Sequence, residues 1–337
     1  MRRTPIIAVG VLIAAVTFAA CYDTSTAPES SAGDPSDLTI TKLAPGGMSF
    51  ATAGDAAEQF HSIMDAVNVG LAAAGENYRV AMVEYVTGAG DEAGATVITQ
   101  DLGNKQLAFD FVPFDPRRAW SGSVAGPDDD ITYAVDMTID AVPPWGGLSG
   151  AATTAAIDAA MTTWDAEACS ALPITSNPDF GVDIGVIAFI FGLGGSPFVL
   201  ADIQHAGWRD IDFVPGVLGA TFTFGFTDGP RCAANPTFSD VDGNGKCDAA
   251  FREIYYDPSF NWADDGVTNF DVEAVALHEA GHGLSQAHFG NIFIKNDGSL
   301  LRAPAAVMNP FILGQTRTLL GTDDGGHCSI WSEWPNN

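Results

Sequence analysis

Two histidines and one glutamate fall within five consecutive residues of this 337-residue chain, as His278, Glu279 and His282. Histidines four positions apart on an α-helix project from the same face, and Glu279 lies on the same side of that helix. Imidazole nitrogens are common zinc ligands, and a carboxylate beside them can act as a general base. The spacing therefore predicts a hydrolytic zinc site carried by a helix.

A third protein ligand is needed, because a catalytic zinc ion has three protein ligands and keeps one further position open. His288 is the nearest candidate, but on an unbroken helix it would face away from His282. We therefore expect the helix to end near Leu284 or Ser285 and the chain to turn back. Asp324 is an alternative third ligand.

These residues resemble the zinc motif of the metzincin peptidases, and most closely that of the matrixin-like branch. The family motif is His-Glu-x-x-His-x-x-Gly-x-x-His, followed by a turn that contains methionine. The chain matches the histidines and the glutamate, and it supplies Met308 for the turn. It departs from the motif at Ser285, where the family has glycine because the turn needs a left-handed backbone. A residue other than glycine costs roughly 1–2 kcal/mol in that conformation.

The resemblance implies a zinc-dependent metalloendopeptidase. Zinc held by His278, His282 and His288 would polarise the scissile carbonyl and lower the pKa of a water molecule toward about 7. Glu279 would take the proton of that water and later deliver it to the leaving amine. Met308 would form a floor under the metal. The expected partners are protein or peptide substrates.

The elements that must position these residues follow a mixed order of helices and strands, so we expect the α+β fold class. The resemblance implies a metzincin-like catalytic domain over residues 118–337, with a twisted mixed sheet and an active-site helix. Residues 48–117 are interpreted as a small N-terminal α+β unit of unknown role, because Asp115-Pro116-Arg117-Arg118 breaks the pattern.

Apolar periodicity and turn residues predict the individual elements. Helices are expected at Asp55–Ala74, at Ser149–Ala168, and from a cap at Asn269 or Asp271 onward. Strands are expected at Tyr78–Thr87, Thr96–Gln100, Gln106–Phe114, Ile131–Asp136, Val182–Phe191, Ala201–Gln204, Gly219–Phe226 and Ile254–Tyr256. We expect Gly219–Phe226 to be the edge strand along which an extended substrate pairs.

A second candidate metal site is a run of acidic residues spaced like the start of a calcium loop. Asp240, Asp242, Asn244 and Asp248 take positions 1, 3, 5 and 9, with glycine at position 6. Position 12 is Phe251 rather than glutamate, so the bidentate ligand is missing. Calcium binding and a solvated turn without metal both fit this pattern.

The N-terminus predicts export. Two arginines precede an apolar run that ends at Ala20, which is typical of a secretory signal over residues 1–20. The run ends in Ala-Ala-Cys, which resembles a bacterial lipobox, so we expect Cys21 to be lipidated; ordinary cleavage without lipid is the alternative. Residues 21–47 are rich in small and polar residues and should form a flexible linker. We therefore expect the bacterial cell envelope or the extracellular space as the location.

Four cysteines remain after Cys21, and an even number in an exported protein predicts two disulfides. The fifteen-residue separation of Cys232 and Cys247 favours a local disulfide. That pairing leaves Cys169 to bond with Cys328.

The balance of charge limits the classes of partner. The chain has 14 basic and 42 acidic residues, which gives a net charge of −28. Such a surface repels phosphate backbones and anionic lipid, so we expect no nucleic-acid partner. We expect contact with a membrane only through a lipid on Cys21.

Two other functions fit the sequence. One is a cell-surface binding lipoprotein with a non-catalytic zinc site, and the other is a metal-dependent amidase that acts on a non-protein substrate. The presence of Glu279 argues against the first, because a purely structural metal site needs no base.

Overall fold

The computed structural model describes residues 41–42, 53–88, 96–98, 108–118, 129–138, 141–178, 181–211, 213, 216–268, 270–294, 300–312 and 314–336. The expected signal (residues 1–20), the lipidation site Cys21 and the candidate cap Asn269 lie outside these residues. So does most of the expected linker, whose Thr41–Lys42 form the short strand β1. No helix within the described residues is long and apolar enough to cross a membrane.

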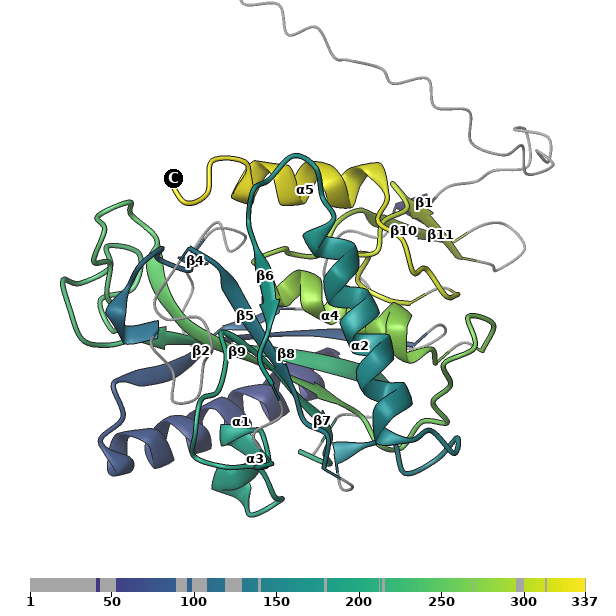
Figure 1. The fold of residues 1–337 in the computed structure, drawn as a ribbon, viewed down its shortest axis with the longest axis horizontal. Coiled ribbons are helices and arrows are strands. Elements are labelled where there is room, and N and C mark those ends of the chain that lie inside the picture. The colour runs from purple at the N-terminus through teal and green to yellow at the C-terminus, as the bar shows by residue number, and fades with distance from the viewer. Residues whose placement is uncertain are drawn as a thin grey trace, which may run out of the picture. The chain divides into compact units, whose positions relative to one another are not determined.

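A mixed eight-stranded sheet forms the centre of the fold (Figure 1). Its strand order is β3 (Thr96–Ile98), β2 (Tyr78–Thr87), β8 (Val217–Phe226), β9 (Cys247–Tyr256), β7 (Ile203–Trp208), β5 (Ile131–Val135) and β6 (Ile174–Ser176). The short strand β4 (Phe109–Asp110) pairs with β9 off this path. Strands β9, β7, β5 and β6 run parallel, whereas β8 is antiparallel to β9 and to β2. The sheet confirms the α+β class.

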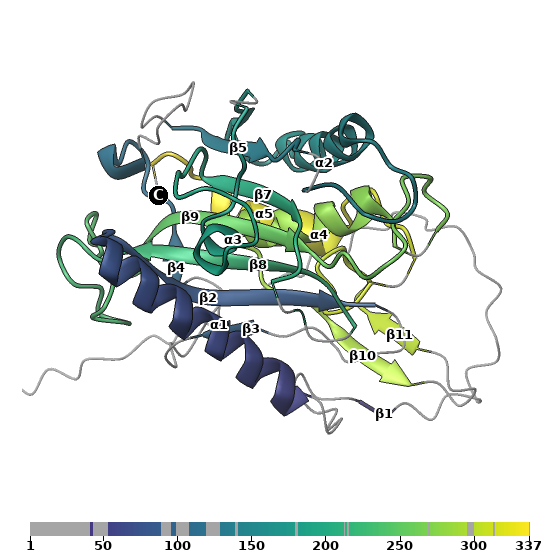
Figure 2. The same ribbon diagram turned by 90° about the horizontal axis from the view of Figure 1, so that it is seen from below.

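Two apolar clusters cover the two faces of this sheet. One cluster joins α2 (Gly150–Asp165) and α4 (Val272–Gly283) to residues of the parallel strands, including Ile203 and Ile254. The other joins α1 (Ala53–Ala74) and α3 (Val186–Phe191) to Phe222 and Tyr255. Figure 2 shows α1 and α2 well separated, with the strands between them. The sheet is therefore buried on both faces, as a parallel-rich sheet requires.

Helices α2 and α4 begin where the sequence predicts them, and α1 begins two residues before its predicted start, at Ala53. The N-cap of α2 is Ser149, whose side chain accepts from the backbone N–H of Ala152 at 3.2 Å. The N-cap of α4 is Asp271, which accepts from Ala274 at 3.0 Å. These caps satisfy N–H groups that have no partner within the helix.

The N-terminal segment differs from the prediction of a separate unit over residues 48–117. Strand β2 pairs with β8 along its whole length, from Tyr78 opposite Phe226 to Thr87 opposite Val217. By their contacts, residues 40–337 form one compact unit. The physical reason is burial of both faces of β2, which can be achieved only inside the larger sheet: Val83 packs in the cluster with α1, and Val86 packs in the cluster with α4.

The same pairing contradicts the prediction that Gly219–Phe226 is an edge strand. Strand β8 has β2 on one side and β9 on the other, so both of its backbone edges are hydrogen-bonded. Alternation of threonine and phenylalanine indicates a strand, but it does not indicate how many neighbours that strand has.

The run Val182–Phe191 is also wrong as a strand, since its second half forms α3. The backbone N–H groups of Val186 and Ile187 donate to the buried carboxylate of Glu253, at 2.6 and 3.2 Å. The helix ends at Gly192, which has a left-handed backbone with φ of 71°. A tertiary contact therefore determines the secondary structure of this segment, because its apolar run is compatible with either a strand or a helix.

The sequence analysis did not predict strands β1 and β6. It also did not predict the strands β10 (Asn291–Ile294) and β11 (Leu300–Ala303), which form a small sheet with β1, or the helix α5 (Gly321–Trp331). Helix α5 is joined to the turn that follows α2 by the disulfide Cys169–Cys328. Both predicted disulfides are confirmed, the other being Cys232–Cys247.

Candidate metal centre

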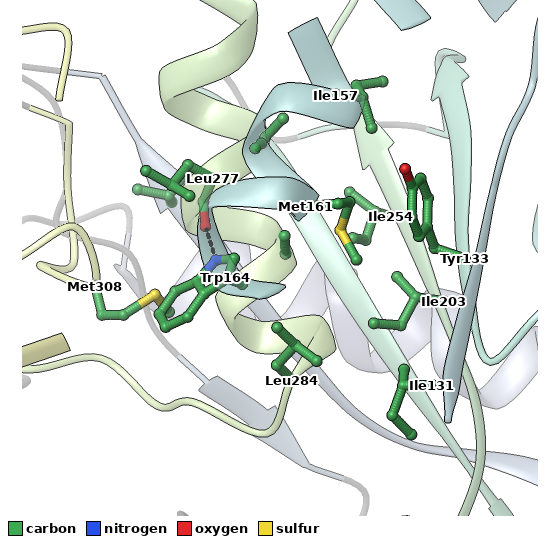
Figure 3. Packing of buried hydrophobic residues seen from close by; sticks show 14 of the residues in the cluster. Ile131, Tyr133, Ile157, Met161, Trp164, Ile203, Ile254, Leu277, Leu284 and Met308 are labelled. Carbon is green, nitrogen blue, oxygen red and sulfur yellow. Dashed lines mark hydrogen bonds between the residues drawn. The ribbon is translucent and has the colours of Figure 1, made fainter. Parts of the chain in front are cut away.

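Helix α4 is held in the core by close contacts on its apolar side. The indole N–H of Trp164, from α2, donates to the carbonyl oxygen of Leu277 at 2.9 Å (Figure 3). A Cβ atom added to Gly281 would lie 2.3 Å from the sulfur of Met308 and 2.9 Å from the Trp164 ring. A side chain at position 281 would have to displace Met308 or the Trp164 ring, so Met308 packs directly against the helix between the two histidines of the motif.

The three predicted metal ligands converge on one point. The Nε2 atoms of His278 and His282 are 3.1 Å apart, and the Nε2 atom of His288 is 3.2 Å from the first and 3.1 Å from the second. Tetrahedral zinc with Zn–N bonds of about 2.0–2.1 Å needs N···N separations of roughly 3.3–3.4 Å. The described cluster contains only these three histidines, so Asp324 does not belong to it.

Hydrogen bonds made by the Nδ1 atoms determine which ring nitrogen carries the proton in His278 and His282. The Nδ1–H group of His278 donates to the carbonyl oxygen of Val307 at 2.7 Å, and that of His282 donates to Gln286 at 2.8 Å. The Nε2 lone pairs are then free for a metal. Burial lowers the pKa of His278 to about 4 and the pKa of His282 well below its usual value. Both imidazoles are therefore neutral near pH 7, the form that binds zinc.

The chain reverses after α4 as the placement of His288 requires. Helix α4 ends at Gly283, and the N–H of Gln286 donates back to the carbonyl oxygen of Gly281 at 2.8 Å. Ser285 has φ of 66°, so the left-handed backbone expected at the family glycine position is present. Its hydroxyl accepts from the guanidinium of the buried Arg252 at 2.9 Å. This bond offsets part of the conformational cost of a non-glycine residue.

The turn around Met308 is held by α5. The carboxylate of Asp323 accepts from the N–H groups of Val307 and Met308, at 2.8 and 3.1 Å. The carbonyl oxygen of Met308 in turn accepts from Phe289, the residue after His288, at 2.7 Å. Asp323 therefore supports the turn that contacts both His278 and the segment carrying His288, the predicted third ligand.

Glu279 lies fully buried beside strand β8. One carboxylate oxygen, Oε2, accepts from the hydroxyl of Thr221 at 2.6 Å. The other, Oε1, has no hydrogen-bond partner among the described residues. Burial raises the pKa of Glu279 well above its usual value, and the hydrogen bond from Thr221 opposes that shift. A Cβ atom on Gly219 would lie 2.9 Å from Oε1, so strand β8 approaches this carboxylate closely.

Sequence reasoning did not identify Glu84, Thr221 or Asp323 as parts of the site. Glu84, on β2, has a carboxylate oxygen 3.3 Å from Nδ1 of His282. No local pattern marks these residues, because each reaches the site from an element that pairing or packing brings there. Only the alternation in Gly219–Phe226 suggested that one face of β8 is buried.

Strand β2 lies between β8 and the segment that follows the Met308 turn. The carbonyl oxygen of Thr87 accepts from the N–H of Ile312 at 3.0 Å, and Thr87 pairs with Phe311 in parallel fashion. Strand β2 therefore occupies the position beside β8 in which the sequence predicts a substrate strand.

The acidic residues of the predicted calcium loop also come together. Ligand oxygens of Asp240, Asp242 and Asp248 lie within 4.8 Å of one another. Asn244 lies in the same loop, where its amide nitrogen donates to Asp242 at 3.1 Å.

Comparison of the chain with models of protein families and with curated proteins finds no match in either case.

Proposed function

We propose that this protein is a zinc-dependent metalloendopeptidase of the metzincin type, with a matrixin-like catalytic unit. The observation that carries the proposal is the triangle of His278, His282 and His288 Nε2 atoms with sides of 3.1–3.2 Å. A base, Glu279, follows the first ligand on the same helix. The strand order, with antiparallel β8 beside parallel β9, β7 and β5, supports the same assignment.

The three histidines would hold the zinc ion, which supplies a Lewis acid for the scissile carbonyl and acidifies water. Glu279 would accept the proton of the attacking water at Oε1, the oxygen without a partner among the described residues. Thr221 holds the other oxygen and so orients the carboxylate. Burial favours the protonated form that forms next, which can return its proton to the leaving amine.

We further propose that the protein is exported and anchored by lipid at Cys21. The apolar signal run and its Ala-Ala-Cys ending support this location. The two disulfides support an oxidising compartment.

A second candidate is favoured by the position of β2. Because β2 already pairs with β8, an extended peptide cannot pair with that strand while β2 is in place. A metal-dependent amidase that acts on a compact, non-protein substrate would not need a free strand edge. The chemistry assigned to Glu279 and the histidines would be unchanged.

The two candidates are separated by metal analysis combined with a casein-degradation assay. We expect one zinc ion per chain and casein cleavage that a chelator abolishes. The variant His282→Ala should lose zinc and activity, whereas His61→Ala, which removes an exposed histidine on α1, should keep both. Zinc retained in full by His282→Ala would contradict the site. Bound zinc without cleavage of any protein or peptide would favour the amidase or the binding lipoprotein.

A further inference from the structure

We propose that Glu84, on the N-terminal strand β2, is a positioning residue of the candidate metal centre and orients the imidazole of His282 for the metal. This role rests on the zinc site of the proposed function, and it adds a residue that the family motif does not contain. A carboxylate oxygen of Glu84 lies 3.3 Å from Nδ1 of His282, and the two side chains are buried, with 5% and 0% exposed. The N-terminal segment would therefore contribute to the centre itself.

The pairing register of two strands brings Glu84 beneath α4. Glu84 lies opposite Thr221 in the antiparallel pair of β2 and β8. Side chains directly opposite each other on such strands point to the same face of the sheet. Thr221 donates its hydroxyl to Glu279 at 2.6 Å, so this is the face that α4 covers. Met82 and Val86, two positions to either side of Glu84, pack in the cluster that contains α4. One cross-strand pair thus contacts the proposed base and one of the predicted ligands.

The outer nitrogen of His282 has two acceptors. Its Nδ1–H group donates to the carbonyl oxygen of Gln286 at 2.8 Å, and Glu84 is the second acceptor at 3.3 Å. The Nδ1–H group of His278 donates to the carbonyl oxygen of Val307, and among the described residues no carboxylate pairs with this imidazole. A carboxylate behind a ligating imidazole holds the ring in place and makes its other nitrogen a stronger donor to the metal. The charge of Glu84 would therefore act on the metal through Nε2 of His282.

Arg252 is the second group that Glu84 faces, and it suggests a purely structural alternative. The buried guanidinium of Arg252 donates to the carbonyl oxygen of Gly283 and to the hydroxyl of Ser285, at 2.6 and 2.9 Å. Burial lowers the pKa of Arg252 to about 10, and the negative charge of Glu84 opposes that shift. Glu84 and Arg252 line the same small hollow. A charge that only balances Arg252 would affect stability, whereas one that also acts on His282 would affect the metal.

The test measures metal binding by the full chain with the substitution Glu84→Gln. Glutamine has nearly the same shape as glutamate but carries no negative charge. Competition with a fluorescent zinc chelator measures the affinity for zinc, and the visible absorption of protein loaded with cobalt reports the geometry of the ligands. We expect Glu84→Gln to bind zinc about 10–100-fold more weakly than the parent, because a ligand loses its supporting contact. We also expect its cobalt absorption bands to shift.

The matched control is Glu253→Gln, which removes the charge of another buried glutamate of the same sheet. Glu253 accepts from the N–H groups of Val186 and Ile187, which pack in the cluster on the other face. This variant should lose stability but keep the zinc affinity and the cobalt spectrum of the parent. Circular dichroism verifies that each variant is folded, and urea unfolding measures its stability.

The possible failures are distinguishable. A parent-like zinc affinity and cobalt spectrum in Glu84→Gln would overturn the role of Glu84 and leave the proposed zinc site intact. An equal loss of affinity in Glu84→Gln and Glu253→Gln would make Glu84 a structural residue. A parent protein that binds no zinc would overturn the proposed function and the role of Glu84 with it.

A second variant keeps the test decisive if Glu84→Gln does not fold. Glu84→Asp retains the charge near Arg252 but withdraws the carboxylate from His282 by one methylene group. We expect this variant also to bind zinc more weakly than the parent. A parent-like affinity in folded Glu84→Asp would contradict the proposed contact.

Discussion

Ser285 shows how a single residue can depart from a motif without losing its geometry. The family resemblance implies glycine at this position, and the structure retains the left-handed backbone with serine in its place. The hydroxyl bonds to Arg252, whose guanidinium also donates to the carbonyl oxygen of Gly283 at 2.6 Å. The sequence predicted the strained backbone but not the partner, because Arg252 lies on β9, far away in the chain.

We expect Ser285→Ala to be less stable than Ser285→Gly by about 1–2 kcal/mol. Both variants lose the hydrogen bond to Arg252, which costs about 1–3 kcal/mol because the donor is charged and buried. Only glycine removes the cost of the left-handed backbone. Urea unfolding of the two zinc-loaded variants measures the difference, and equal stability would show that the backbone at position 285 carries no such cost.

At the scale of elements, sequence patterns located the helices and strands that bear the site. Helices α1, α2 and α4 and strands β2, β5 and β8 have strong periodicity and clear caps or turns. Helix α5 has neither, since its sequence Gly-Thr-Asp-Asp-Gly-Gly is a poor helix former. It is fixed instead by the disulfide at Cys328 and by Trp331, whose indole N–H donates to Leu284 at 2.9 Å. Such long-range contacts leave no local signal.

The contacts of α5 predict that Asp323 supports the candidate metal centre. Asp323→Ala removes the acceptor for Val307 and Met308, and Val307 in turn orients His278. Loss of such a supporting contact typically weakens metal binding about 10–100-fold. Asp324→Ala is the control, because this neighbour was the alternative ligand and lies outside the histidine cluster. Competition with a fluorescent zinc chelator measures both affinities, and an unchanged affinity in Asp323→Ala would remove Asp323 from the site.

At the scale of the whole molecule, the prediction of a separate unit over residues 48–117 is corrected, because these residues belong to the same compact unit as the rest of the sheet. The turn at residues 115–118 does not separate two domains, since β2 enters the same sheet as β8, β9, β7 and β5. Its Arg117 also pairs with Asp248 of β9 at 2.7 Å. Strand pairing between segments more than a hundred residues apart could not be read from local periodicity.

This organisation predicts that the N-terminal segment cannot be removed. A chain that lacks residues 1–88 would lose α1 and β2 and would expose the face of β8 that carries Phe222, Phe224 and Phe226, all buried. Exposing three phenylalanine side chains costs several kcal/mol, about 1.5–3 kcal/mol each. We expect this variant to lose its near-ultraviolet circular dichroism, whereas a chain that lacks only residues 1–40 keeps it. A folded, zinc-binding protein without residues 1–88 would restore the two-unit interpretation.

The position of β2 also bears on how a peptide could bind. Strand β2 pairs with β8 and reaches Ile312, so access to β8 requires β2 to move or requires the substrate to bind elsewhere. The proposed chemistry is therefore tested better by a substitution at Glu279 than by an experiment that assumes which strand the substrate pairs with.

The central claim is tested most directly by measuring zinc content and peptide cleavage in Glu279→Gln. Glutamine has nearly the same shape, and Glu279 is assigned as a base rather than a ligand, so the variant should keep one zinc ion. Its kcat should fall about 10²–10⁴-fold, with little change in KM, because the lost proton acceptor acts in the transition state. Loss of zinc would make Glu279 a structural residue. Full activity with zinc in place would contradict the proposed mechanism.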